Sequence, residues 1–172
     1  MGKTPASSKM IQKRNTGWPF LFALFFLFSL TFGCQDFPKD PEKTLEQVTN
    51  GTLKVGYSEN PPWVVKGPQG PTGIEADLVK AFAKSLNATI EWQNDTEQNL
   101  MERLEKNELH LVMAGVTDDT PWKQKISFTR PFAEVAKKKH VLCVIKGENA
   151  FTVKLEKFLH QQQAYLQNSL QP

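Results

Sequence analysis

The sequence predicts a single three-layer α/β lobe, in which a small, mainly parallel sheet is flanked by helices. Short apolar strands alternate with amphipathic helices between residues 53 and 115, an order that builds parallel strands joined by right-handed helical crossovers. About 120 residues follow the polar N-terminal part, which is enough for one hydrophobic core. We therefore expect one folded domain over residues 44–168.

Local patterns predict the first elements. Thr44, with Gln47 three residues later, forms a capping box for a short helix, and Asn50-Gly51 supplies its left-handed stop. Alternating apolar and polar residues then predict a strand over 53–58. A helix over 74–87 is predicted from apolar residues that recur every four positions, namely Ile74, Leu78, Phe82 and Leu86.

The later elements continue the alternation. We expect a strand over 89–93, a helix over 96–107 that Asp95 or Thr96 caps, and a buried strand over 110–115. The apolar run from Val141 to Ile145 predicts a strand over 140–146 in the same sheet. A helix then begins at Glu148, with an apolar face made of Phe151, Leu155, Phe158 and Leu159.

The N-terminal segment has the composition of an export signal. Four basic residues precede an apolar run from Trp18 to Phe32, which ends at Gly33-Cys34. Fifteen residues of helix rise about 22 Å, short of the ~30 Å hydrocarbon core, so the run suits a signal peptide better than a membrane span. We predict a signal peptide over 1–34 and a short polar tether over 35–43.

Cys34 follows a small residue, as the acylated cysteine of bacterial lipoproteins does. Thr31 and Phe32 differ from the residues usual before such a cysteine, so lipidation, plain cleavage and an uncleaved anchor all remain open. Lipidation of Cys34 is the outcome we predict. It places the protein in the periplasm or cell envelope, attached to a membrane through its N-terminus.

The charge balance argues against a nucleic-acid partner. The chain has 21 basic and 18 acidic residues, and the four basic residues of the leader leave 17 basic against 18 acidic residues in the remainder. No basic stripe is therefore available for nucleic acid. Cys143 has no second cysteine near it and is expected to be a small buried hydrophobe. The three histidines are scattered, and no motif implies a metal or cofactor.

Five segments over residues 44–132 stand in a characteristic order: the helix at Thr44, then Leu53–Tyr57, Gly73–Leu78, Ala114–Thr117 and Phe128–Phe132. This order resembles the first lobe of the bacterial extracellular solute-binding proteins of family 3, the polar amino acid binders of ABC transporters. The resemblance implies half of a type II periplasmic-binding-protein fold, with the second lobe apparently missing. Residues 133–172 then form either the closing strand and helix of that lobe, which we favour, or an outgoing strand followed by an unrelated helix.

The resemblance also implies a ligand site at the carboxyl ends of the strands. Family members hold an amino acid through an aromatic residue, a backbone carbonyl, a hydroxyl and an arginine, positions that correspond here to Trp63, Gly115, Thr117 and Trp122. Trp122 therefore stands where the carboxylate-binding arginine is expected. Tyr57 lies at the end of the first strand and completes the candidate site.

The segment 118–122 carries two carboxylates, which disfavour a bound α-carboxylate. Thr120 and Pro121 begin a short helix whose positive end Asp119 favours. Asp119 is either part of this helix start alone or a ligand contact as well. Trp63 and Trp122 either form the walls of a cleft for a cationic or apolar solute or are simply buried.

The function that this pattern predicts is an envelope-tethered binding protein for a small polar or cationic solute, which binds weakly or with a partner such as an ABC permease. The alternative is a sensor or scaffold lobe that contacts another envelope protein outside transport. We expect a protein that is not an enzyme, because the catalytic carboxylates of enzymatic family members need two lobes around the substrate.

Overall fold

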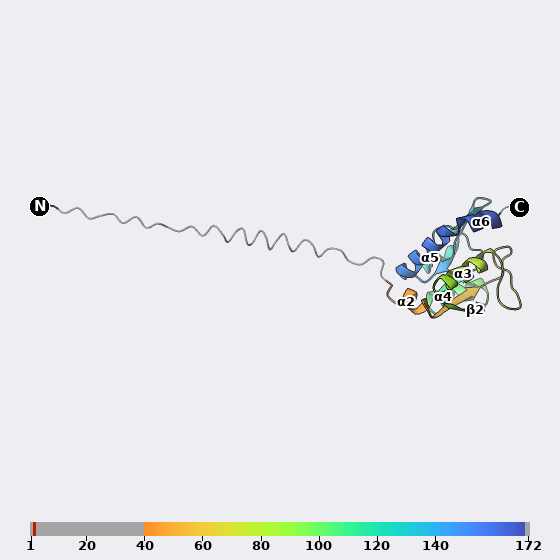
Figure 1. Ribbon diagram of the computed structural model, residues 1–172, viewed down its shortest axis with the longest axis horizontal. Coiled ribbons are helices and arrows are strands. Elements are labelled where there is room, and N and C mark those ends of the chain that lie inside the picture. The colour runs from red at the N-terminus through yellow and green to blue at the C-terminus, as the bar shows by residue number, and fades with distance from the viewer. Residues whose placement is uncertain (1, 3–39, 171–172) are drawn as a thin grey trace. The chain divides into compact units, whose positions relative to one another are not determined.

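A five-stranded sheet in the order β2-β1-β3-β7-β4 forms the centre of the fold (Figure 1). The computed structural model describes Gly2 and residues 40–170, so the predicted leader, Cys34 and most of the tether lie outside the described residues. β1 (Thr52–Tyr57) pairs in parallel with β2 (Thr89–Asn94) and with β3 (Leu111–Met113). β7 (Cys143–Val144) runs antiparallel between β3 and β4 (Ser127–Phe128). The mainly parallel sheet is thereby confirmed.

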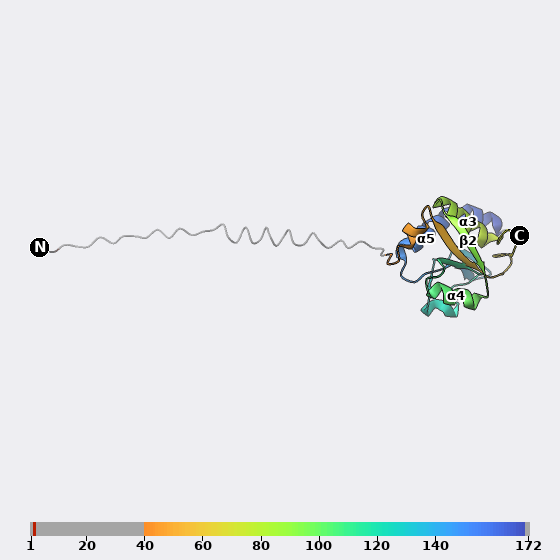
Figure 2. The ribbon, with the colours of Figure 1, turned by 90° about the horizontal axis from the view of Figure 1, so that it is seen from below.

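Helices cover both faces of this sheet, as the three-layer prediction requires. α3 (Ile74–Ser85) and α5 (Asn149–Gln161) lie on one face and α4 (Glu97–Glu105) on the other (Figure 2). The alternation of side chains along β3 divides the core, because Leu111 and Met113 join the cluster under α3 and α5 while Val112 joins the cluster under α4. The predicted strand near residues 140–146 is confirmed as a member of the sheet, although only Cys143–Val144 pairs in it, while His140 ends a strand of a separate hairpin.

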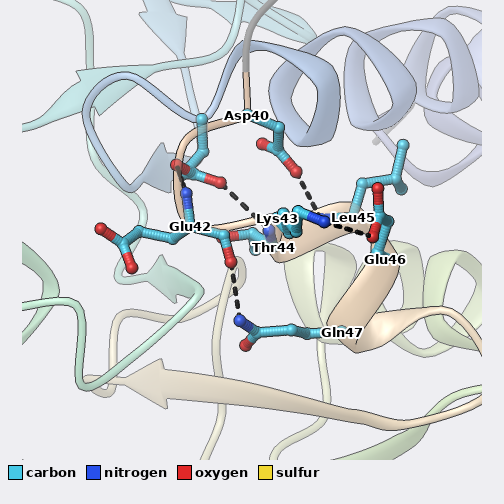
Figure 3. A network of polar contacts seen from close by, with 8 residues as sticks. Asp40, Glu42, Lys43, Thr44, Leu45, Glu46 and Gln47 are labelled. Atoms are coloured by element: carbon cyan, nitrogen blue, oxygen red, sulfur yellow. Dashed lines mark hydrogen bonds and ion pairs between the residues drawn. The ribbon is translucent and has the colours of Figure 1, made fainter.

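The predicted capping box at Thr44 is wrong. The helix α2 (Thr44–Val48) has Lys43 as its N-cap, with no hydrogen bond from a capping side chain, and Thr44 is buried inside it. Two carboxylates take that role. The distant Glu148, at the start of α5, accepts from the backbone N–H groups of Glu42 at 2.9 Å and Thr44 at 3.1 Å. Asp40, which lies just before the helix, accepts from the N–H of Leu45 at 2.8 Å (Figure 3). The N-terminus of α2 is therefore held by tertiary contacts.

The two carboxyl groups at this helix start, Asp40 and Glu148, have pKa values shifted in opposite directions. Burial, together with a hydrogen bond to Glu148, raises the pKa of Asp40 to about 6. Burial alone would raise the pKa of Glu148 as well, but its hydrogen bonds with Asp40 and with the backbone of Glu42 and Thr44 lower it. Below about pH 6, Glu148 is thus the carboxylate that stays ionised and stabilises the positive end of α2.

We expect Glu148→Ala to destabilise the fold by about 2 kcal/mol, because it leaves two backbone N–H groups without an acceptor. Chemical denaturation at pH 7 measures the loss. Glu46→Ala is a matched control, since Glu46 lies on the same helix and makes only an exposed ion pair with Lys43. Equal losses in the two variants would show that Glu148 does not anchor α2.

A short hairpin occupies the segment that follows Phe132. β5 (Ala133–Val135) and β6 (Lys138–His140) pair antiparallel, and the two residues between them, Ala136 and Lys137, both have positive φ. Two such residues give the turn that suits the twist of a tight hairpin. The chain thus turns back toward the sheet within residues 133–140. Neither this hairpin nor α6 (Gln163–Ser169) is predicted from the sequence.

Candidate functional site

The carboxyl ends of β1 and β3 meet at the point where the connections of the sheet diverge. β1 lies between β2 and β3, so the chain crosses to the other side of β1 as it passes from β2 to β3. α3 leaves toward one face and α4 toward the other (Figure 2). Ligands of open α/β sheets bind at such switch points. The loops over residues 58–73 and 114–120 therefore frame the candidate site.

Trp63 is the anchor of the first loop. Its backbone N–H donates to the carbonyl of Asn60 at 2.9 Å, which closes a tight turn after β1. The indole is 6% exposed and stacks on the ring of His140 with centroids 3.7 Å apart, while Phe132 meets it edge-on at 6.0 Å. Trp63 is thus held between residues that come from distant parts of the chain.

Gly115 begins the second loop in a backbone conformation that favours glycine. Its φ is +63°, and a Cβ at this position would collide with the side chain of Asn60. Asn60 in turn donates through Nδ2 to the carbonyl of Ala114 at 2.8 Å. The N–H of Gly115 donates to Oε2 of Glu75 at 3.0 Å. Two side chains outside the loop therefore fix its first residues.

Thr117 and Asp119 form the exposed part of the second loop. The Thr117 hydroxyl donates to Oδ1 of Asp119, and this hydrogen bond holds the pKa of the carboxyl below its ordinary value. Thr117 also forms an isolated bridge with His140, the residue that stacks on Trp63. The structure thus brings Trp63, Gly115, Thr117 and Asp119 to one edge of the sheet.

Trp122 and Tyr57 are held elsewhere. Trp122 lies in a short 3-10 helix, η2 (Pro121–Gln124), which begins after Thr120 as predicted, although the Thr120 side chain makes no capping hydrogen bond. Its indole N–H donates to Glu97 of α4 at 3.1 Å, and the ring packs against the cluster under α4. Trp63 belongs to the other cluster. Tyr57 is buried, and Trp92 meets its ring edge-on at 6.2 Å.

Three further residues shape this edge and are absent from the sequence prediction: Asn60, Glu75 and His140. Glu75 has no exposed surface, and burial raises its pKa to about 8, even though hydrogen bonds from the backbone of Gly115 and Ala114 act in the opposite direction. Burial, and then the charge of Lys138, lowers the pKa of His140. At neutral pH both groups are therefore uncharged. The charged groups at the edge are the exposed carboxylates of Glu59 and Asp119, together with Lys138 and Lys123, whose charges act on Asp119.

One described cavity is lined by residues outside the candidate site. It has a volume of about 560 Å³ and is bounded by residues 130–132 and by the C-terminal half of α5 with the start of α6. Phe132 and Leu159 form part of its wall, and Arg130 on its rim is paired with Glu156 at 3.5 Å. None of the six predicted ligand residues lines it.

Comparison with known sequences identifies the family. Residues 53–168 match the family described as bacterial extracellular solute-binding proteins, family 3. The chain belongs to this family. The match continues through α5 and into α6. The interpretation of residues 133–172 as the closing segment of the lobe stays a prediction.

The similar curated proteins carry an enzyme's name. A membrane-bound lytic murein transglycosylase F of Vibrio cholerae is 33% identical over 90 residues, which are 51% of this chain and 17% of that protein. The protein of the same name from Pseudomonas fluorescens is 29% identical over 131 residues, or 75% of this chain and 26% of that protein. The chain thus spans about a quarter or less of the length of these relatives.

Solved structures confirm the predicted fold. The arginine-bound form of domain 1 from TmArgBP superimposes with a TM-score of 0.61 at 21% identity, covering 67% of this chain and 97% of that one. An ancestral cationic amino acid solute-binding protein gives 0.63 at 16% identity, covering 72% and 95%. The solute-binding lobe is therefore the fold of residues 40–170.

The expectation of a protein that is not an enzyme is wrong. It is overturned by the relatives, which share the solute-binding region with this chain and are named as transglycosylases. Composition and motifs give no warning of this, because the shared region itself carries a binding fold.

Within residues 40–170, no helix is both long and apolar enough to cross a membrane. In the same range, no three His, Cys, Asp or Glu side chains gather as metal ligands.

Proposed function

We propose that this chain is a solute-binding protein of the cell envelope that takes a small cationic or polar solute at the edge formed by Trp63, Gly115, Thr117 and Asp119. The observation that carries the proposal is the exposed carboxylate of Asp119 at this edge. Asp119 is exposed and its carboxyl has a lowered pKa, so it is ionised over the physiological range. Trp122 replaces the arginine that would hold an α-carboxylate, and its indole N–H already donates to Glu97.

The arginine-bound form of domain 1 from TmArgBP supports a single lobe as a binding unit. Two-lobed binders gain affinity by enclosing the solute between the lobes. A solute on this edge keeps one side open, so we expect weak binding unless a partner covers it. An ABC permease is one candidate partner. The alternative is that the lobe acts as a sensor and contacts another envelope protein.

We expect agmatine to bind more tightly than arginine, and arginine more tightly than glutamate. Agmatine and arginine share the guanidinium group and differ in the α-carboxylate, for which the edge has no arginine fork. Isothermal titration of the full chain in a mild detergent gives the three affinities. Tighter binding of glutamate than of agmatine would overturn the proposed selectivity.

We expect Asp119→Asn to weaken agmatine binding by about tenfold, because it removes an ionised acceptor at the edge. Glu91→Gln serves as the control, since Glu91 is an exposed carboxylate on β2, at the far edge of the sheet. Both variants change the net charge equally. Equal weakening by the two would mean that only the overall field acts on the ligand.

We further propose that lipid attached to Cys34 tethers the lobe to a membrane. The basis is the apolar run that ends at Gly33-Cys34. Cys34→Ala is expected to abolish labelling by a palmitate analogue and to move the protein from the membrane fraction to the soluble one. Labelling that persists in Cys34→Ala would rule out this attachment.

The names of the relatives favour a second candidate function, in which the lobe recognises a murein-derived solute for a murein-cleaving activity. Incubation of the full chain with purified sacculi, followed by chromatography of the released muropeptides, tests for cleavage. Titration with muropeptides prepared from sacculi by a separate muramidase tests for recognition. Recognition without cleavage would assign the lobe to ligand binding in that process.

A further inference from the structure

Glu75 is a fully buried carboxyl that contacts both loops of the candidate site. It lies in the first turn of α3, where its backbone N–H donates to the carbonyl of Trp63 at 3.0 Å. Its side chain reaches the other loop, where Oε2 accepts from the N–H of Gly115 at 3.0 Å. One residue therefore connects the loop after β1 with the loop after β3.

Burying a carboxyl group at this position costs desolvation free energy. Its side chain is completely shielded from solvent, and its second oxygen, Oε1, has no hydrogen-bond partner among the described residues. An apolar side chain of similar size would avoid the desolvation cost. What the carboxyl adds is an acceptor for the amide of Gly115, at a residue whose φ of +63° departs from ordinary loop backbone.

We infer that Glu75 is a positioning residue, which sets the placement of the Gly115–Thr117 segment relative to Trp63. The consequence for ligand binding rests on the proposed function, whereas the consequence for the loop does not. Asn60 supports the same placement from the solvent side, through its hydrogen bond to the carbonyl of Ala114. The loop is thus held by Glu75 through the Gly115 amide and by Asn60 through the Ala114 carbonyl.

The raised pKa of Glu75 supports this assignment. A neutral acid accepts from Gly115 without leaving a charge in the core. Cys143 of β7 is a titratable neighbour of Glu75. Its pKa is raised chiefly by burial and also by the charge of the Glu75 carboxyl. A glutamine has the same shape as the neutral acid and provides the same acceptor, so it should replace Glu75 without loss.

Hydrogen exchange at the Gly115 amide tests the inference without a ligand. In the full chain, labelled with ¹⁵N and kept in a mild detergent, Glu75→Gln should leave the exchange rate of this amide within about threefold of wild type. Glu75→Leu and the shorter Glu75→Asp should each accelerate it by about tenfold or more. Asp77→Asn, on the exposed side of the same helix, should leave it unchanged.

Agmatine titration of the same variants separates this inference from the proposed function. If wild type binds agmatine, Glu75→Gln should retain the affinity and Glu75→Asp should lose it at least tenfold. If wild type does not bind agmatine, the proposed ligand class is wrong, and the Gly115 exchange rates still decide the positioning role. Unchanged exchange at Gly115 in Glu75→Asp, or loss of protection in Glu75→Gln, would overturn the inference. Glu75→Asp keeps this test available even if Glu75→Leu does not fold.

Discussion

Glu75→Gln is expected to remove most of a fall in stability that wild type shows between pH 5 and pH 8. The pKa of Glu75 is about 8 in the folded protein, against 4.5 as its reference value. Between these values the unfolded chain releases a proton that the folded chain retains, so the free energy of unfolding decreases as the pH rises. Each pKa unit corresponds to about 1.4 kcal/mol, and we expect a loss of about 2–5 kcal/mol across this range.

The difference between wild type and Glu75→Gln isolates this carboxyl from the other groups that titrate in the same range. Asp40, with its pKa raised to about 6, contributes a fall of the same sign. His110 and His140 have pKa values lowered chiefly by burial, so they contribute a rise in stability with pH. Denaturant unfolding at five pH values gives both curves, with Asp77→Asn as the control. Parallel curves for wild type and Glu75→Gln would contradict the prediction.

The sequence predicts the elements whose patterns are local. Two patterns depend only on neighbours along the chain: the alternation over Thr52–Tyr57 and the apolar residue at every fourth position from Ile74 to Leu86. Both elements form within one or two residues of the expected bounds. Thr96 caps α4 through a hydrogen bond from the N–H of Asn99, because a cap acts over three residues. Local chemistry thus determines the framework of the sheet.

Features that depend on distant partners are not visible in the sequence. Thr44 has the capping-box pattern, yet Glu148 binds its N–H from 104 positions away, and that contact replaces the local one. His140 stands among three lysines and looks exposed, but the hairpin brings it onto Trp63. The sequence gives only a weak indication that Glu75 is buried: it stands next to Ile74, in a helix that buries residues over a broad face. Its partner, Gly115, follows only from the fold.

The candidate site divides in the same way. Trp63, Gly115, Thr117 and Asp119 come together because each follows a parallel strand, and the carboxyl ends of such strands share one edge. Trp122 lies in the same chain segment but turns toward α4, where Glu97 accepts its indole N–H. Whether a side chain points into a site or onto a helix depends on its rotamer and its partners. Sequence spacing alone does not determine either.

Trp63→Ala is expected to destabilise the lobe by about 3–5 kcal/mol, because it leaves a large cavity at the junction of the loop after β1 with β6. The indole is buried against His140 and Phe132, and neither ring has another described aromatic partner to replace it. Trp63→Phe keeps an aromatic ring and should lose less than half as much. Denaturant unfolding at constant pH measures both losses.

The same substitution has a second consequence, which a general loss of packing would not produce. Burial is the largest cause of the lowered pKa of His140, and the stacked indole supplies part of that burial. In Trp63→Ala the pKa of His140 should therefore move upward, toward the ordinary 6.5, while Trp63→Phe should leave it near the wild-type value. Titration of the His140 ring signals by NMR follows this change. A loss of less than about 1 kcal/mol with an unchanged His140 titration would show that Trp63 is not the anchor of this edge.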